Sequence, residues 1–324
     1  MRLLVTGGAG YIGSVVTHRL VEAGHRVVVV DDLSTGFIAN LHDDVQFHQL
    51  SVHDVASVLT PTAGFDGVLH FAGKIEVAES VAHPDRYWHT NVTGSLALLA
   101  AVRAAGTPRL IFSSTGSMYQ PSGSAKLTED AVVRPGNPYA ATKLMVDLML
   151  AGECAAFGLG AMSLRYFNAA GAVGSLGERH DPESHLIPIV LQVASGLRAD
   201  LKLYGDDYPT TDGTCVRDYI HVADLATAHL VALAAIEPGR HEIYNLGNGN
   251  GYSNKQVIDT AREVTGHPIP VTLTARRPGD VAVSVAASDK ARRELGWRPA
   301  KPELAEIIGD AWAFHRRVSS TVSR

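Results

Sequence analysis

The sequence predicts an α/β fold, a doubly wound parallel sheet of the Rossmann type with a smaller α/β substrate domain beside it. Three features of the 324 residues lead to this prediction. A glycine-rich turn follows the first apolar run, apolar runs alternate with amphipathic stretches through the first half, and the chain becomes loop-rich after Asn168. Alternating strands and helices are typical of a parallel sheet, and ligands bind at the carboxyl ends of such strands.

The glycine-rich turn predicts a site for a dinucleotide. Residues 3–5 form a short apolar run, and residues 12–21 have the apolar spacing of an amphipathic helix. Between them, Gly7, Gly10 and Gly13 form a G-x-x-G-x-x-G pattern. Glycines at this spacing allow a tight strand-to-helix turn and let the backbone approach a pyrophosphate, while the helix N-terminus favours the phosphates.

The next apolar run, residues 27–30, indicates that the dinucleotide is NAD. It ends at Asp31, 18 residues after Gly13, where a carboxylate can accept hydrogen bonds from an adenosine ribose. The same carboxylate would repel a 2′-phosphate. No arginine follows closely, because the next residues are Asp32, Leu33 and Ser34. We therefore expect NAD and not NADP.

Later elements complete the sheet and outline the second domain. Further strands are expected at 67–71, 109–112, 161–165 and 243–246, with helices near 87–105 and 140–157. Ser253 and Gln256 form a capping-box pattern for a helix that Gly266 ends, and residues 304–312 begin a final amphipathic helix. The expected NAD-binding domain covers 1–168 plus about 217–247, and the substrate domain covers about 169–216 and 248–324.

A tyrosine and a lysine one helical turn apart form the candidate catalytic centre. Tyr139 and Lys143 make a Y-x-x-x-K pattern, and i, i+4 spacing puts them on one helix face. A phenol has an ordinary pKa of about 10. We expect the lysine ammonium to lower the pKa of the tyrosine. Thr115 ends a predicted strand and should place its hydroxyl beside Tyr139. Around a nicotinamide, this set suits removal of a hydride and a proton from an alcohol carbon.

Composition predicts a cytoplasmic enzyme without nucleic-acid or membrane partners. The formal charge is only −5 and the basic residues are not clustered. No apolar stretch approaches the roughly 18 residues of a membrane span, and the first strand leaves no room for a signal peptide. The two cysteines, Cys154 and Cys215, suit buried thiols in a reducing cytosol. They lack metal-ligand spacing, so we expect no metal.

Taken together, these motifs resemble the UDP-glucose 4-epimerases, a family of extended short-chain dehydrogenases/reductases. The resemblance covers nearly the whole chain. It rests on residues 5–13, 70–73, 91–94, 112–115, 138–139 with Lys143, 164–168, 204–222, 244–247 and 276–280. It implies reversible epimerisation at C4 of a UDP-hexose, with NAD as a resident catalyst and a 4-keto intermediate.

The resemblance also implies roles for individual residues. Tyr139 would be the base for the sugar 4-hydroxyl, Lys143 would hold Tyr139 ionised, and Thr115 would bond the 4-oxygen. Residues implied on the cofactor side are Gly7, Gly10, Tyr11, Ile12, Gly13, Asp31, Asp32, Ser34, Ser51, Val52, Phe71, Ala72, Gly73, Asn91, Ser113, Tyr139, Lys143 and Tyr166. Those implied for the UDP-sugar are Thr115, Tyr139, Asn168, His185, Leu186, Leu203, Tyr204, Arg217, Arg277, Asp280 and Ser284.

The resemblance leaves the substrate and the assembly open. The small Ser284 implies room for an N-acetyl group, so a 4-epimerase acting mainly on UDP-N-acetylglucosamine or UDP-glucuronate is the alternative. Ser51, where the family has Asp, and the segment 74–75 depart from the family pattern on the cofactor side. The family also implies a homodimer through helices 87–105 and 140–157.

Two other functions are disfavoured. A 4,6-dehydratase would need an Asp-Glu pair after Thr115, where this chain has Gly116 and Ser117. A catalytically inactive sensor of NAD(H) or UDP-sugar would not need the intact set of Thr115, Tyr139 and Lys143.

Overall fold

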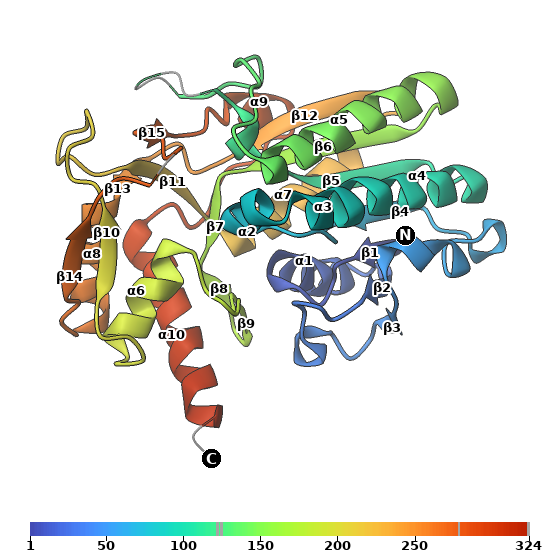
Figure 1. The fold of residues 1–324 in the computed structure, drawn as a ribbon. Coiled ribbons are helices and arrows are strands. Elements are labelled where there is room, and N and C mark those ends of the chain that lie inside the picture. The colour runs from blue at the N-terminus through green and yellow to red at the C-terminus, as the bar shows by residue number, and fades with distance from the viewer. Residues whose placement is uncertain (121–122, 124–125, 278, 323–324) are drawn as a thin grey trace.

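A seven-stranded parallel sheet forms the centre of the molecule in the computed structural model, which describes residues 1–120, 123, 126–277 and 279–322 (Figure 1). Its order is β12-β6-β5-β4-β1-β2-β3. The strands are β1 (Arg2–Thr6), β2 (Arg26–Asp31), β3 (Gln46–Gln49), β4 (Gly67–His70), β5 (Arg109–Thr115), β6 (Gly160–Tyr166) and β12 (His241–Leu246). The chain runs outward from β1 to β2 and β3, then returns to β4 on the other side of β1. The switch point therefore lies where β1 and β4 end.

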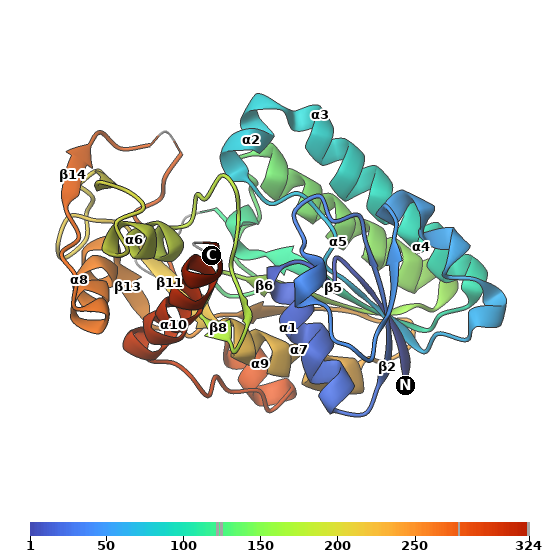
Figure 2. The ribbon, with the colours of Figure 1, turned by 90° about the horizontal axis from the view of Figure 1, so that it is seen from below.

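Helices cover both faces of this sheet (Figure 2). One face carries α1 (Tyr11–Glu22), α7 (Val222–Ala235) and α9 (Asp289–Glu294); the other carries α2 (Val77–Ala82), α3 (Pro84–Tyr87), η4 (Trp88–Thr93), α4 (Gly94–Ala105) and α5 (Pro138–Phe157). Successive strand side chains point to opposite faces. Leu3 and Val5 accordingly pack in one apolar cluster and Leu4 in another, which explains why β1 is apolar throughout.

A smaller part with its own apolar core lies at the carboxyl end of the sheet. Its helices α6 (Leu186–Ala194), α8 (Asn254–Thr265) and α10 (Leu304–Val322) enclose a third cluster that includes Trp312. Its strands are β7 (Asn168–Ala170), β8 (Ala172–Val173), β9 (Leu176–Gly177), β10 (Leu201–Tyr204), β11 (Val216–His221), β13 (Gly251–Ser253), β14 (Val271–Thr274) and β15 (Val283–Ser284). Short helical turns are η1 (Ile38–Asn40), η2 (Val52–Ser57), η3 (Pro61–Ala63) and η5 (Gly116–Met118).

The predicted elements are present, and the structure adds others that were not predicted, among them β3, α6 and α7. The helix expected near 87–105 is divided into α3, the π-helical η4 and α4. Helix α7 was not predicted because it is apolar nearly all round: it is buried between neighbouring elements and so lacks an amphipathic pattern. The capping box at the start of α8 is confirmed, since the Ser253 and Gln256 side chains bond reciprocally to each other's backbone N–H groups. Among the described residues, no helix is both long and apolar enough to cross a membrane.

One C-terminal segment belongs to the core of the large sheet. Helix α9 packs against β12, and the indole of Trp297 is only 2% exposed and belongs to the apolar cluster on one face of the large sheet. Its Nε1–H donates to the carbonyl oxygen of Asp224 at 3.0 Å. Residues 289–297, which we expected in the substrate domain, therefore cover part of the large sheet.

A buried ion pair ties α5 to the sheet. The Arg165 guanidinium on β6 lies 2.8 Å from the Asp147 carboxylate on α5, and both side chains are 3% exposed. Arg165 also donates to the Tyr119 hydroxyl at 2.7 Å, and that hydroxyl donates to Asn245 at 2.8 Å. Buried charges require partners of this kind, so the network fixes α5 relative to β6 and β12.

Removing one member of this pair should be costly. We expect Asp147→Asn to lower the free energy of unfolding by about 3–5 kcal/mol, because Arg165 would remain buried without a counter-charge. The double variant Asp147→Leu/Arg165→Met should recover most of that loss. Urea unfolding of the three proteins measures both effects. A loss below about 1 kcal/mol in the single variant would contradict the assignment.

Candidate active site at the carboxyl edge of the sheet

The turn between β1 and α1 is shaped to hold a phosphate group. A Cβ atom at Gly13 would lie 2.1 Å from the carbonyl oxygen of Gly7, and Gly7 itself has φ +74°. Only glycine tolerates either condition without strain. Helix α1 has no side-chain cap at Gly10 and no acidic residue in its first turn. Its free N–H groups therefore suit the pyrophosphate of a dinucleotide.

Asp31 stabilises this turn and lies where the adenosine ribose of a dinucleotide is expected. One carboxylate oxygen accepts from the Ala9 N–H at 2.9 Å, and the other accepts from the Leu33 N–H at 2.8 Å. Burial raises its pKa, and these two hydrogen bonds oppose the rise. Each oxygen keeps a second lone pair for a ribose hydroxyl. Asp32 and Ser34 are exposed, and they form a local turn in which the Ser34 N–H donates to Asp32.

The other residues predicted on the cofactor side lie around the same edge. The Tyr11 hydroxyl donates to the Gly171 carbonyl oxygen at 2.7 Å and so joins α1 to the smaller part. Ser51 caps η2. Val52 packs closely on Gly94, since a Cβ atom added to that glycine would lie 2.6 Å from the Val52 side chain. Ile12, Phe71 and Ala72 are half-buried; the N–H groups of the latter two donate to the Thr6 carbonyl oxygen.

Asn91 holds two parts of the site together. Its amide oxygen accepts from the Lys74 N–H at 2.7 Å, and its amide nitrogen donates to the Lys74 carbonyl oxygen and to the Thr142 hydroxyl, each at 3.0 Å. A Cβ at Gly73 would lie 3.1 Å from Asn91 and 3.6 Å from the Lys143 ammonium. Asn91 therefore fixes the loop after β4 against α5, a positioning role that its sequence motif did not reveal.

The three predicted catalytic side chains come together where β5 ends and α5 begins. Asn137 caps α5 by accepting from the Ala140 N–H at 2.9 Å, which fixes the first turn that carries Tyr139. The Thr115 hydroxyl hydrogen-bonds to the Tyr139 side chain. The Lys143 ammonium donates to the Ser113 carbonyl oxygen at 2.9 Å and is 3% exposed.

Burial controls the protonation of this set. It lowers the pKa of Lys143 to about 8, although Asp147 opposes the shift. It also raises the pKa of Tyr139, which the hydrogen bond from Thr115 lowers in part. The net shift of the Tyr139 pKa in this structure is therefore upward, opposite to the direction that we expected from the nearby Lys143, because desolvation of the phenol dominates.

A layer of buried polar side chains supports the site from below. The Tyr166 hydroxyl lies 2.5 Å from His229 Nε2 and also bonds to Ser113. His70 is held between Thr6 and Ser95 at 2.7 and 2.9 Å. Burial lowers the pKa of His70 to about 3, so its ring is neutral and acts as a fixed hydrogen-bond link.

The residues predicted for the substrate form two groups in the smaller part. In the first, the Arg277 guanidinium stacks 3.9 Å above the Tyr204 ring, and Arg217 lies 3.6 Å from Asp280. Ser284 pairs with Arg217 across β15 and β11, and Leu203 precedes Tyr204 on β10. Asn168, on β7 beside β11, donates to the Asp218 carbonyl oxygen at 3.0 Å. Pro278 of this motif lies outside the described residues.

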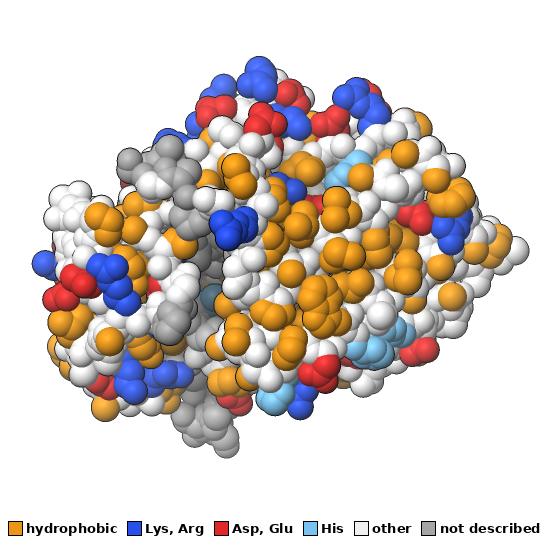
Figure 3. All heavy atoms as spheres, turned by 45° about the horizontal axis from the view of Figure 1, so that its top comes forward, with side chains coloured by type: hydrophobic (Ala, Val, Ile, Leu, Met, Phe, Trp, Pro, Cys, Tyr) orange, Lys and Arg blue, Asp and Glu red, His pale blue; other side chains and the backbone are white. Residues whose placement is uncertain are grey.

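His185 and Leu186 form the second group, at the start of α6. The neighbouring Ser184 hydroxyl donates to Glu76 at 2.5 Å, which links this segment to the loop after β4. Glu76 is also close enough to Tyr139 to raise the pKa of that phenol. Figure 3 shows the surface hollowed along the line where the two parts meet. The second group therefore borders the catalytic centre.

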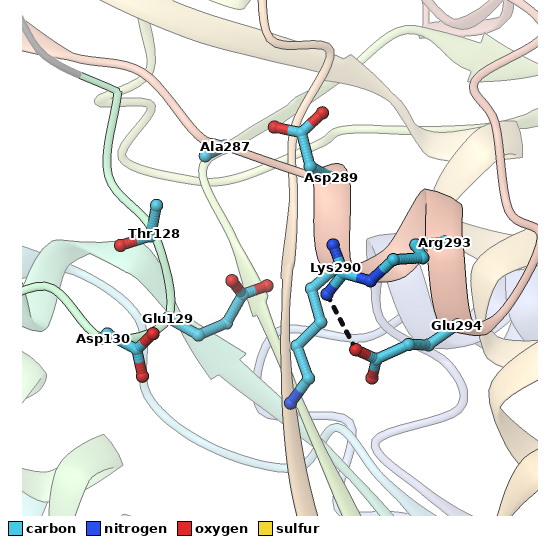
Figure 4. Close-up of a pocket in the computed structure, with 8 residues that line it drawn as sticks. All are labelled: Thr128, Glu129, Asp130, Ala287, Asp289, Lys290, Arg293 and Glu294. Atoms are coloured by element: carbon cyan, nitrogen blue, oxygen red, sulfur yellow. Dashed lines mark hydrogen bonds and ion pairs between the residues drawn. The ribbon is translucent and has the colours of Figure 1, made fainter.

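A separate surface pocket holds none of the predicted residues. It lies between the 128–130 loop and α9 (Figure 4). Its charges are largely paired: Arg293 lies 2.9 Å from Glu294, and the Lys290 ammonium points away to Glu242 at 3.0 Å. This pocket has no hydroxyl–phenol–ammonium set, so the catalytic candidate stays at the sheet edge.

Comparison with known proteins agrees with this geometry. A model of the NAD dependent epimerase/dehydratase family matches residues 3–247. The UDP-glucose 4-epimerase of Streptomyces lividans is 54% identical, covering 97% of this chain and 96% of the relative, and that of Corynebacterium glutamicum is 52% identical, covering 97% and 95%. A crystal structure of UDP-glucose 4-epimerase from Brucella ovis in complex with NAD has a TM-score of 0.92 and 40% identity, covering 97% of this chain and 98% of that one. The chain therefore belongs to the NAD dependent epimerase/dehydratase family, and the relatives that it matches over nearly its whole length are UDP-glucose 4-epimerases.

Proposed function

We propose that this chain catalyses the reversible, NAD-dependent epimerisation at C4 of a UDP-hexose, interconverting UDP-galactose and UDP-glucose. The observation that carries the proposal is the catalytic set at the switch edge of the sheet. There, Thr115 bonds to Tyr139 and Lys143 is buried against Ser113. The set stands beside a phosphate-binding turn, in a chain more than half identical to UDP-glucose 4-epimerases.

Tyr139 is the group that moves the proton. As a phenolate it removes the proton of the sugar 4-hydroxyl, and as a phenol it returns that proton at the end of the cycle. Thr115 bonds to the phenol and stands ready to bond the sugar 4-oxygen. Lys143 provides a fixed positive charge near this centre while one of its N–H groups donates to the Ser113 carbonyl oxygen.

NAD fits the edge defined by Gly7, Gly13 and Asp31, and when bound it supplies the hydride acceptor at sugar C4 and a positive charge that favours the phenolate. The hydride that leaves C4 returns to the other face, so the cycle consumes no oxidant or reductant. The chain must then keep the 4-keto sugar from escaping between the two halves of the reaction.

The smaller part provides that hold. Arg217 donates through Nη1 to the Val216 and Val281 carbonyl oxygens, and its Nη2 lies 3.6 Å from Asp280. Arg277 is stacked on Tyr204. Guanidinium groups suit bidentate contacts with a diphosphate. We assign Asn168 on β7 and Leu203 on β10 to the same UDP-binding group, and His185 and Leu186 at the start of α6 to its border with the catalytic centre.

The preferred sugar can be proposed from the relatives and from the size of Ser284. The relatives described above are UDP-glucose 4-epimerases, which favours UDP-glucose and UDP-galactose over a main substrate with an N-acetyl or carboxylate group. Ser284 is small and half-buried beside Arg217, so we propose that N-acetylated UDP-sugars are tolerated. We also place the enzyme in the cytoplasm, a proposal supported by two buried free thiols, Cys154 and Cys215.

We further propose a homodimer through α4 and α5. Leu96, Met145 and Leu148 are 55%, 41% and 59% exposed on these helices. Figure 3 shows hydrophobic side chains gathered on this side of the larger part. At the rim, Arg103 lies 2.8 Å from Glu153, one residue from each helix. An apolar surface with a charged rim is typical of a protein interface.

The reaction and its base can be tested together. The purified protein, without added NAD, should convert UDP-galactose to UDP-glucose. Tyr139→Phe should reduce kcat by on the order of a hundredfold or more, because the ring remains but the proton acceptor is lost. Coupled detection of UDP-glucose measures both rates. Tyr244→Phe, at a β12 phenol that bonds to Glu294 at 3.3 Å and is not one of the predicted site residues, is the control and should stay near wild type. A Tyr139→Phe rate close to wild type would refute the assignment.

Lys143 should lower the stability of the fold at neutral pH. Its pKa falls from 10.5 to about 8 on folding, so the penalty is full below about pH 8 and disappears as the pH rises toward 10.5. Lys143→Met should therefore abolish activity yet raise the free energy of unfolding at pH 7 by on the order of 1–3 kcal/mol. Urea unfolding of dinucleotide-free protein at pH 7 and 10 checks this. For Lys255→Met, at an exposed lysine, the difference in unfolding free energy from the wild type should be the same at pH 7 and pH 10. An equal difference in unfolding free energy between Lys143→Met and the wild type at both pH values would contradict the prediction.

The dimer predicts the effect of a charge on the α5 face. Leu148→Glu should give a monomer at micromolar concentration, because a carboxylate would be buried without a partner at the interface. Light scattering after gel filtration measures the mass. The matched control is Leu197→Glu, at a leucine that is 65% exposed after α6, and it should leave the mass unchanged. A wild-type protein that is already monomeric would refute the interface.

A further inference from the structure

Two histidines and two glutamates converge in the segment between β9 and α6. Glu178, His180, Glu183 and His185 follow an E-x-H-x-x-E-x-H pattern, and one ligand atom from each lies within 4.8 Å of every other. Their side chains come from eight consecutive residues, so no distant element has to move to bring them together. We propose that these four residues form a binding site for a single zinc-type divalent ion.

The spacing of the ligand atoms suits a small ion. His185 Nδ1 lies 2.6 Å from Glu178 Oε1 and 3.4 Å from Glu183 Oε1, while His180 Nδ1 lies 3.0 Å from Glu178 Oε1. A tetrahedral zinc site with bonds of about 2.0–2.1 Å places its ligand atoms about 3.3–3.5 Å apart. Small outward adjustments of the side chains would therefore open the cluster to that size.

Burial explains why a cation belongs there. The Glu178 and Glu183 side chains are only 8% and 3% exposed, so two carboxylates share a nearly dry volume. Two like charges at this separation need a positive charge between them. In addition, the Nδ1 atom of His180 is shielded from solvent and points to the same Glu178 oxygen as His185 Nδ1 does, at 3.0 and 2.6 Å. Loss of the shared proton from each imidazole would turn both nitrogens into lone-pair donors for one ion.

The donor types select the kind of ion. Imidazole nitrogens with carboxylate oxygens suit zinc and similar transition ions, whereas magnesium and calcium favour an all-oxygen set. The side chain of His185 is 46% exposed, which leaves a route for the ion to enter. The cysteine spacing that argued against a metal does not bear on this segment, because neither Cys154 nor Cys215 belongs to it.

The bound ion would fix the entrance to α6. Glu183 already accepts from the N–H groups of Ser184 and His185 at 2.8 and 2.9 Å, and Ser184 reaches across to Glu76. A metal on Nδ1 of His185 leaves Nε2–H as a donor of fixed tautomer. This last consequence rests on the proposed function, because it makes that N–H available to a UDP phosphate.

Metal content tests the site directly. The tag-free enzyme with its bound dinucleotide is stripped with a chelator, dialysed and titrated with Zn²⁺ by calorimetry, and with Co²⁺ followed by visible absorption. We expect one equivalent of Zn²⁺ per chain and the absorption of four-coordinate Co²⁺. His180→Ala and the isosteric Glu178→Gln should each weaken Zn²⁺ binding by roughly a hundredfold or more. The control Glu263→Gln/His267→Ala changes an exposed acid and an exposed histidine on and after α8, and should bind as wild type does.

Two results would overturn the proposal. The first is no stoichiometric binding by the wild type, as expected if protonated imidazoles alone neutralise the carboxylates. The second is binding that survives in both site variants. Glu178→Gln keeps the shape of the side chain, so it remains informative if His180→Ala does not fold. Because metal content is measured without substrate, an inactive protein that binds one site-dependent Zn²⁺ would refute the proposed reaction and leave the metal site standing.

Discussion

The burial of one cation organises the catalytic edge of this molecule. The Lys143 ammonium is almost inaccessible to water, and an isolated charge in such a place is costly. The surroundings compensate in several ways: the Ser113 carbonyl accepts a hydrogen bond from the ammonium, the Phe112 ring lies 4.9 Å away, and Asp147 adds a negative charge one turn along α5. Asp147 is in turn fixed by Arg165 on β6. The position of α5 on the sheet and the electrostatics of the site thus depend on the same few contacts.

Sequence reasoning predicted the parts of the fold that local chemistry determines. The β1–α1 turn is specified by glycines within a few residues of one another, and the capping box of α8 by Ser253 and Gln256. Tyr139 and Lys143 share a helix, so their spacing alone places them together. The alternation of strands and helices was enough to predict a parallel sheet, although not the π-helical turn of η4 or the largely apolar helix α7.

The remaining features depend on partners that are far apart in the sequence. Asn91 hydrogen-bonds to Thr142, which lies 51 residues away in the sequence, and Tyr119 hydrogen-bonds to Asn245, which lies 126 residues away. No periodicity encodes such pairs. The direction of the Tyr139 pKa shift was also mispredicted, because spacing shows that a lysine is near but not how strongly burial desolvates the phenol. The cluster around Glu178 was missed for a simpler reason: its ligand spacing is present in the sequence, in a segment interpreted as a loop in which only His185 was given a role, toward the UDP-sugar.

The three tryptophans of the chain each report on a different layer of the molecule. Trp297 is enclosed in the core of the large sheet, Trp312 stacks on His315 in the core of the smaller part, and Trp88 is 40% exposed in the helical run that also carries Leu96. Indole emission depends on the polarity around the ring, so the fluorescence of the native protein is a sum of three distinguishable environments. Variants that keep only one of the three indoles would give separate optical probes for the large sheet, the smaller part and the helical surface, without an attached dye.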